Sequence, residues 1–143
     1  MDPEVTEYRL RMGAKSKQKG KAGEREFANC LRNEGWASAR RGCQFAGHDE
    51  EGKEFPDVVC SELPFMHWEV KRTKRQTNIG DAYCQAMRDA KADQVPAIAH
   101  RKDHYPWMIT ISFEDFAKFL RGDFPPADSE KNTNNKGTKI NEQ

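Results

Sequence analysis

Charged side chains stand in the stretch "PDVVCSELPFMHWEVKR", residues 56–72, where a buried sheet would exclude them. Asp57 lies at the start of one expected strand, and Glu69 and Lys71 lie inside the next. Moving a charge out of water is costly unless a partner or a metal ion compensates. Two acids and a lysine on neighbouring strands therefore indicate a functional site rather than part of a core.

These residue types suit the hydrolysis of phosphodiester bonds with the help of Mg²⁺. Side chains directly opposed on antiparallel strands lie about 5 Å apart, so Asp57 and Glu69 can meet across the pair. Mg²⁺ takes oxygen ligands, usually one or two carboxylates with water and phosphate, and the main-chain carbonyl of Val70 can add another. Lys71 shares a strand face with Glu69, and its ammonium group can position the attacking water or stabilise phosphate charge. We expect the metal to act as a Lewis acid and to generate hydroxide, with Mn²⁺ as a substitute.

A third acid is expected from a helix near the N-terminus. The segment "GEREF" contains Glu24 and Glu26, which one helical turn cannot aim at the same place. Phe27 and Leu31 mark the buried side of this helix, and Glu24 lies beside that side because it precedes Phe27 by three residues. Glu24 is therefore the expected third acid, and Glu26 is expected at the surface.

The predicted elements that position these residues are a helix, three strands, a helix, two strands and a helix. This order predicts an α/β fold with a central mixed five-stranded sheet flanked by helices. Asn78 and Ser112 are predicted to cap the second and third helices, and Ile79, Ala82, Tyr83, Ala86 and Met87 form an apolar stripe on the second. The first helix is predicted at 19–34, and the strands at 36–40, 57–61, 65–72, 95–101 and 107–112.

The length and composition limit the classes of protein to which this chain can belong. Its 143 residues are enough for one domain, predicted at 19–122 between a flexible basic leader (1–18) and a disordered polar tail (123–143). Four scattered cysteines without a CxxC pair argue against a zinc site and are expected to be reduced thiols. No signal peptide and no membrane-length apolar segment is evident, so we expect a cytoplasmic protein.

Basic residues are concentrated in two blocks, although the net charge is only +1. Residues 9–41 hold ten Lys or Arg against three acids, residues 69–75 hold four against one, and the segment 48–57 between them holds five acids and one lysine. Basic blocks around an acidic pocket are typical of a protein that binds a polyanion beside a cation site, although any single block can simply be a solvated face. The residues expected to bind DNA are Lys15, Lys17, Lys19, Lys21, Arg40, Arg41, Arg72, Lys74 and Arg75.

The motifs resemble those of a known nuclease superfamily. "PD" followed by "EVK" is similar to the PD-(D/E)xK signature, and "KGKAGEREF" resembles the first helix of archaeal-type Holliday junction resolvases. A phage and prophage group of resolvases or endonucleases is more closely similar, through "RRGCQFAG", "EVKR", "QAMRDA", "AHR" and "PWMITI" in this order. The resemblance covers about residues 19–120.

The resemblance implies a restriction-endonuclease-like core and a Mg²⁺-dependent DNA endonuclease acting on branched DNA such as four-way junctions. It implies a homodimer, because a four-way junction needs two symmetric nicks, and a location with the DNA in the cytoplasm, that of the host cell if the chain is phage-encoded. Two departures are the cysteine near the position of a catalytic-loop serine, Cys43, and the long acidic insert at 48–54. The implied site residues are Glu24, Asp57, Glu69 and Lys71, with Gln85 as a further contact.

Other interpretations remain. The same residues would serve a nuclease that acts on flaps, ends or other replication and packaging intermediates. The fold could also belong to a non-catalytic nucleic-acid-binding module, but the intact Asp57, Glu69 and Lys71 argue against it. Taken singly, Asp57 after a proline is a common turn residue, and Glu69 and Lys71 are common on an exposed edge strand. Their joint order and spacing favour the site.

Overall fold

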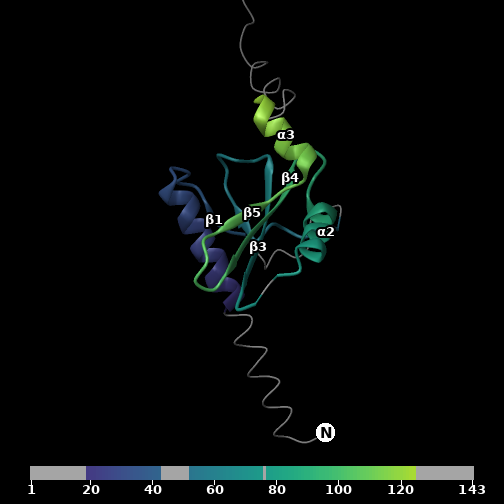
Figure 1. The fold of residues 1–143 in the computed structure, drawn as a ribbon. Helices are drawn as coiled ribbons and strands as arrows, with labels where there is room; N and C mark the ends of the chain where they lie inside the picture. Colours follow the sequence, from purple (N-terminus) through teal and green to yellow (C-terminus); the bar gives the residue numbers. More distant parts are fainter. Residues whose placement is uncertain (1–18, 43–51, 76, 125–143) are drawn as a thin grey trace, which may run out of the picture. The chain divides into compact units, whose positions relative to one another are not determined.

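The computed structural model describes residues 19–42, 52–75 and 77–124. Contacts divide the chain into two units, one that runs to Ile111 and one that begins at Ser112. Within these described residues the element order is the predicted one, with five strands in one mixed sheet and three helices (Figure 1). The expected α/β class with a restriction-endonuclease-like core is confirmed.

The sheet has its strands in chain order, β1 to β5. Neighbouring strands run antiparallel except β3 and β4, which pair in parallel over eight residues each. A parallel pair needs a crossover connection, and α2 supplies it. The strands are β1 (Arg40–Arg41), β2 (Val58–Val59), β3 (Met66–Thr73), β4 (Val95–Lys102) and β5 (Met108–Thr110).

The first two strands are much shorter than the sequence predicted. The segment before β1 makes a local turn instead, in which the N–H of Ala39 donates to the carbonyl of Trp36. After β2 the chain turns again, through a bond from the N–H of Leu63 to the carbonyl of Cys60. Backbone groups that bond within a turn are not available for the sheet, so β1 and β2 form only a narrow edge.

The N-terminal helix, residues 19–33, packs on one face of the sheet. Phe27 places its ring 5.1 Å from that of Trp68 on β3 and 5.3 Å from that of Trp107. The buried side predicted from Phe27 and Leu31 is confirmed, since both are buried together with Ala28. This packing fixes the helix that carries Glu24 against the strand that carries Glu69.

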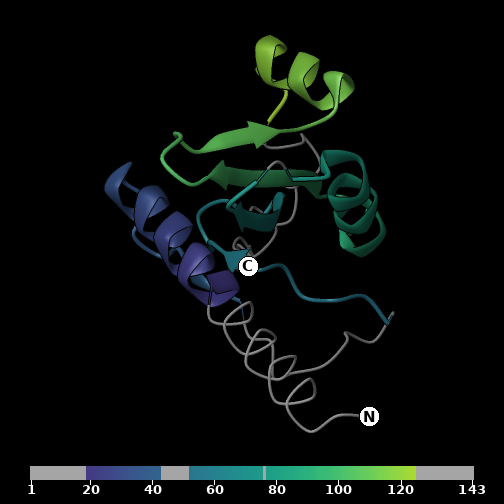
Figure 2. The ribbon, with the colours of Figure 1, turned by 60° about the horizontal axis from the view of Figure 1, so that its bottom comes forward.

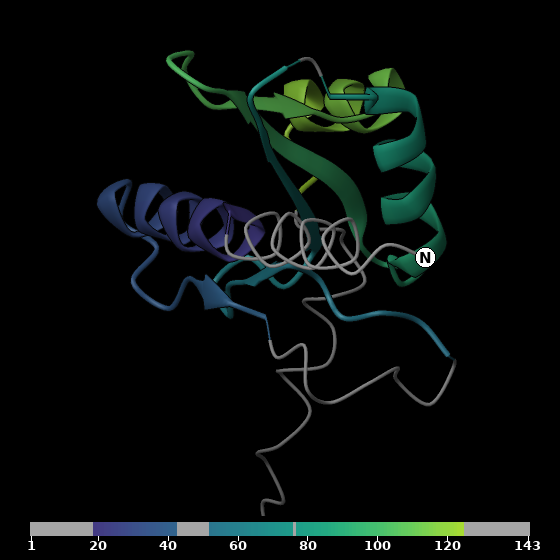
Figure 3. The same cartoon turned by 90° about the horizontal axis from the view of Figure 1, so that it is seen from below.

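The helix α2 (Ile79–Asp89) packs on the other face, so the two helices lie on opposite sides of the sheet (Figures 2 and 3). Ala82 and Ala86 of α2 form a buried cluster with Ile98 of β4. Ile98 is the register partner of Glu69, and paired residues in neighbouring strands project to the same face. Glu69 therefore points to the α2 face, and Trp68 points to the N-terminal helix.

The start of α2 was predicted correctly. The side chain of Asn78 caps the helix and accepts the N–H of Asp81 at 3.1 Å. Its apolar stripe was predicted only in part, because Ala82 and Ala86 are buried whereas Met87 is 56% exposed. Tyr83 packs against the same cluster and is partly buried.

The second unit, described by itself, contains the helix α3 (Phe113–Arg121). Ser112 caps it as predicted, because its side-chain oxygen accepts the N–H of Asp115 at 3.1 Å. The rings of Phe119 and Phe124 lie 4.2 Å apart.

Several expectations fall outside the described residues. They concern the leader, most of the tail, Lys15, Lys17, Cys43 and much of the acidic insert. The described cysteines, Cys30, Cys60 and Cys84, are free thiols. No described helix is both long and apolar enough to cross a membrane.

Candidate functional site

Two backbone hydrogen bonds hold Asp57 against β3. Asp57 directly precedes β2, where Val58 pairs with Trp68. The carboxylate of Asp57 accepts the N–H of Val70 at 2.8 Å, and the N–H of Asp57 donates to the carbonyl of Trp68 at 3.0 Å. These two contacts flank Glu69, so the structure brings together the two acids that the hairpin pattern predicted.

Lys71 is the cationic partner of Glu69. Its Nζ lies 2.9 Å from Oε1 of Glu69 on the same face of β3, as the period of two predicted. Glu69 is only 5% exposed, whereas the side chain of Lys71 is partly exposed. The ammonium group thus connects a buried acid to the surface where a substrate can bind.

Glu24 approaches the same place from the N-terminal helix. It is 7% exposed, and its Oε2 lies 2.7 Å from Nε of Arg41 on β1. Arg41 is the register partner of Val58, the residue after Asp57. The charge of Glu24 acts on Asp57 strongly enough to help raise the pKa of that acid. The charges of Glu69 and Glu24 therefore converge on Asp57, at the β1–β2–β3 edge.

Asp57 is the acid most perturbed by this convergence. Burial, followed by the charge of Glu69, raises its pKa to about 7, and the charge of Glu24 adds to the effect. The bond from the N–H of Val70 and the charge of Lys71 act in the opposite direction and do not cancel it. Strongly raised pKa values of this kind are common at functional sites.

Glu69 has a raised pKa for similar reasons. Burial is the largest cause, and the charges of Asp89 and Glu54 add to it, against the nearby Lys71. Asp89, at the end of α2, is itself buried. Beside Glu69 lies the fully buried His67, whose pKa is lowered, mainly by burial. The negative charge around Glu69 thus exceeds what Lys71 neutralises.

The donor atoms fit a hard divalent cation. Asp57, Glu69 and Glu24 offer carboxylate oxygens, and their mutual repulsion would be relieved by a doubly charged ion. As the side chains lie, no three His, Cys, Asp or Glu residues of the described segments have the spacing of metal ligands. Glu24 faces Arg41 and Glu69 faces Lys71 instead, so both side chains would have to rotate to bind an ion together with Asp57.

A close backbone approach at Gly42 supports the position of Asp57. The N–H of Gly42 donates to the carbonyl of Asp57 at 2.8 Å. A Cβ at this position would lie 1.9 Å from the carbonyl oxygen of Pro56, so only glycine fits. The sequence analysis missed this role, because a glycine in a loop gives no sign of which strand it will meet.

The remaining expected site residues are placed as follows. Gln85 lies on α2 and is half-buried, and among the described residues no hydrogen bond connects it to Asp57 or Glu69. Val70 contacts Asp57 through its N–H group; its carbonyl remains only a predicted ligand.

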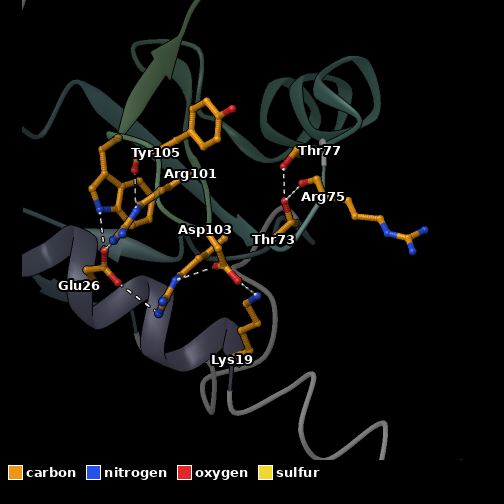
Figure 4. A network of polar contacts seen from close by, with 10 residues as sticks. Lys19, Glu26, Thr73, Arg75, Thr77, Arg101, Asp103 and Tyr105 are labelled. Carbon is orange, nitrogen blue, oxygen red and sulfur yellow. Dashed lines mark hydrogen bonds and ion pairs between the residues drawn. The ribbon is translucent and has the colours of Figure 1, made fainter.

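The expected DNA-binding residues fall into two groups. Lys21, Arg40, Lys74 and Arg75 are exposed and can reach a phosphate backbone. The others described have acidic partners inside the protein. Lys19 lies 3.1 Å from Asp103 (Figure 4). Arg41 pairs with Glu24, and Arg72 lies 3.2 Å from Glu26.

Glu26, which was expected at the surface, is half-buried in an ion-pair network. Its carboxylate pairs with Arg72 and Arg101 and accepts the indole N–H of Trp107 at 3.1 Å. Arg101 and Trp107 lie 75 and 81 positions away along the chain, so local spacing gave no signal for these contacts.

Comparison with known proteins agrees with this arrangement. A family model described as archaeal Holliday junction resolvase (Hjc) matches residues 15–115, a segment that includes all three converging acids and Lys71. The chain matches no curated protein and no solved structure.

Proposed function

This chain belongs to the archaeal Holliday junction resolvase family, and we propose that it cleaves four-way DNA junctions with the help of Mg²⁺. Family membership carries endonuclease activity on branched DNA. The dependence on Mg²⁺, the choice of DNA over RNA and the roles of individual residues are our proposals. The observation that carries them is the convergence of Asp57, Glu69 and Glu24 beside the ammonium group of Lys71.

In the proposed mechanism Asp57 and Glu69 would hold the metal ion, and Glu24 and the carbonyl of Val70 would be further oxygen donors. A bound Mg²⁺ would supply Lewis acidity and lower the pKa of a water molecule. The N–H of Val70 keeps the carboxylate of Asp57 oriented. Glu69 is buried and Asp57 is partly buried, and a less aqueous environment strengthens the interaction of an acid with a cation.

Lys71 acts on the reacting phosphate. Its pairing with Glu69 holds the ammonium group beside the acids, and its partial exposure lets a substrate approach. There the ammonium group orients the attacking water or stabilises the charge that develops on the phosphate oxygens. Gln85 is proposed as a further contact to the site, on the basis of the family resemblance alone.

The exposed cations Lys21, Arg40, Lys74 and Arg75 are proposed to bind DNA phosphates. Such contacts position a duplex arm without reading its sequence. We further propose a homodimer, because one two-fold axis would present two identical sites to the two strands that a resolvase must nick.

Cleavage assays with site variants test the proposed roles. Asp57→Asn, Glu69→Gln and Lys71→Ala should each reduce the cleavage of a four-way junction by roughly 10²- to 10⁴-fold. Lys71→Ala should retain junction binding. The controls Glu34→Gln and Lys91→Ala change exposed residues of the same types and should cleave normally. Nicking that persists in all three site variants would remove the assignment.

A substrate panel tests the specificity. We expect rapid cleavage of an immobile four-way DNA junction with Mg²⁺ or Mn²⁺, and little cleavage of a linear duplex, a flap or an RNA junction. Preferred cleavage of the flap would instead support a replication or packaging nuclease. No cleavage of any substrate, together with no metal binding, would indicate a non-catalytic binding module.

A further inference from the structure

The residues next to the proposed catalytic groups touch each other across two elements. Gly23 precedes Glu24 on the N-terminal helix, and Arg72 follows Lys71 on β3. A Cβ at Gly23 would lie 2.8 Å from Cβ of Arg72, whereas ordinary van der Waals contact begins at 3.4 Å. The contact involves the base of the arginine side chain, which cannot rotate away. Helix and strand are thus as close here as a glycine allows.

Arg72 forms ion pairs with two acids, Glu26 and Asp103. Nη1 of Arg72 lies 3.2 Å from Oε2 of Glu26, one helical turn beyond Gly23, and its Nε lies 3.7 Å from Asp103. Asp103 in turn lies 3.1 Å from Nζ of Lys19 at the start of the described helix. The guanidinium group therefore contacts the helix directly at Glu26 and is linked to its start through Asp103 and Lys19.

The pair between Arg72 and Asp103 is an ion pair without a hydrogen bond. Nε of Arg72 and Oδ1 of Asp103 are both buried without a hydrogen-bond partner among the described residues. They face each other at a distance slightly too long for a hydrogen bond. The direct contacts of Arg72 with the helix are therefore the ion pair with Glu26 and the close approach at Gly23.

From these contacts we infer that Gly23, Arg72 and Glu26 form a clamp that sets the position of Glu24 relative to Glu69 on β3. This inference rests on the proposed metal site. Glu69 and Lys71 project from the β3 face opposite to Arg72, so one short stretch of strand holds the helix on one face and the catalytic groups on the other. Gly23, Arg72 and Glu26 are positioning residues and make no contact with substrate.

The clamp predicts a specific defect for Gly23→Ala. The added methyl group forces helix and strand apart at the residue next to Glu24, while Asp57, Glu69 and Lys71 keep their own contacts. Outer residues that orient metal ligands typically change metal affinity by roughly 10- to 100-fold. We therefore expect the Mn²⁺ dissociation constant to rise by about this factor, and the Mg²⁺ concentration for half-maximal cleavage to rise in parallel.

The matched control is Gly20→Ala on the same helix, where an added Cβ meets nothing within 4 Å. Both variants would be compared with the wild-type protein by electron paramagnetic resonance titration with Mn²⁺, thermal unfolding without metal, and junction binding in EDTA. Gly20→Ala should bind Mn²⁺ as the wild type does. Gly23→Ala should bind it more weakly and still bind the junction. Equal Mn²⁺ affinity of a folded Gly23→Ala variant and the wild type would overturn the clamp.

A second substitution distinguishes a loss of the clamp from a general disturbance of the fold. Arg72→Gly removes the Cβ that the new methyl group would meet, so Gly23→Ala should weaken Mn²⁺ binding no further in the Arg72→Gly background. An equal loss in both backgrounds would contradict the contact. If Gly23→Ala does not fold, Glu26→Gln decides the question, because it keeps the side-chain shape and removes the ion pairs. The clamp predicts weaker Mn²⁺ binding for this folded variant, and unchanged binding would overturn it.

The proposed function and the clamp can fail separately. Absence of Mn²⁺ binding and of cleavage in the wild-type protein would remove the proposed function. A wild type that binds Mn²⁺ and cleaves, with a folded Gly23→Ala variant of the same affinity, would leave the function in place and remove only the clamp.

Discussion

The acids of the site differ in whether a positively charged side chain lies close to them. Lys71 lies close to Glu69 and Arg41 lies close to Glu24, whereas Asp57, among the described residues, has only a backbone N–H donor within hydrogen-bond distance. Asp57 therefore feels both the loss of water and the repulsion of the other two acids, and its pKa rises to about 7. A divalent cation would relieve this repulsion, which makes Asp57 the residue that should report on metal binding.

The raised pKa predicts how stability depends on pH in EDTA. Asp57 titrates at 3.8 in the unfolded chain and at about 7 in the folded protein, so the folded protein binds the proton more tightly. Its stabilising contribution is complete below about pH 4 and is lost as the pH rises through 7. We predict that the free energy of unfolding, measured in urea, falls over this window.

Asp57→Asn should remove the contribution of Asp57 to this dependence and leave the smaller contribution of Glu69, whose pKa is also raised, mainly by burial. At pH 8 the variant should be more stable than the wild type by on the order of 1 kcal/mol, and near pH 4 the difference should vanish. Asp93→Asn, a change of an exposed aspartate, serves as the control. A pH dependence as large in Asp57→Asn as in the wild type would show that another group causes it.

Elements that carry strong local signals were predicted from the sequence. Asn78 and Ser112 cap their helices as expected, and β3 and β4 follow their apolar patterns. The convergence of Asp57 and Glu69 also followed from strand periodicity and pairing. These features depend on neighbours within a few residues or on a single hairpin, which a sequence records directly.

What the sequence could not predict depends on contacts between distant elements. The edge strands β1 and β2 are only two residues long each, because neighbouring backbone groups form hydrogen bonds within local turns instead of in the sheet. Glu26 was predicted at the surface, but the fold places Arg101 and Trp107 in contact with its carboxylate. The roles of Gly23 and Gly42 follow only from the backbone that each meets.

Gly42→Ala tests whether the β1 edge holds Asp57 in place. The methyl group would overlap the carbonyl oxygen of Pro56, and backbone cannot rotate away as a side chain can. We predict a loss of about 1–3 kcal/mol in the free energy of unfolding, the usual cost of overpacking, and a loss of cleavage in the protein that remains folded. Wild-type stability and cleavage would mean that the edge can move without disturbing Asp57. Gly20→Ala is again the control, because its position is open.

At the scale of the whole molecule, the two basic blocks have different roles. The net charge is only +1, so DNA binding must come from local charge. Arg75 and Arg40 are exposed, whereas Arg72 forms ion pairs with Glu26 and Asp103. Sequence reasoning assigned all three to DNA, because exposure and internal pairing cannot be distinguished from a run of basic residues.

The salt dependence of junction binding should separate these roles. Each phosphate contact removed lowers the slope of log K against log salt by about one. Arg75→Ala should therefore weaken binding to junctions of any sequence and reduce the slope by about one. Arg72→Ala should leave the slope unchanged, because we infer that Glu26 and Asp103 hold its guanidinium group away from the phosphates. The opposite result, a lower slope only for Arg72→Ala, would exchange the two assignments.

The central claim is that the carboxylates of Asp57, Glu69 and Glu24 bind one divalent ion beside Lys71. The most direct test is an anomalous difference map from crystals of the wild-type protein soaked in Mn²⁺. We predict a peak within about 2.0–2.5 Å of carboxylate oxygens of Asp57 and Glu69, with Glu24 turned away from Arg41 toward the ion. A peak that is absent from these acids, or that lies elsewhere in a crystal whose site is open to solvent, would contradict the account.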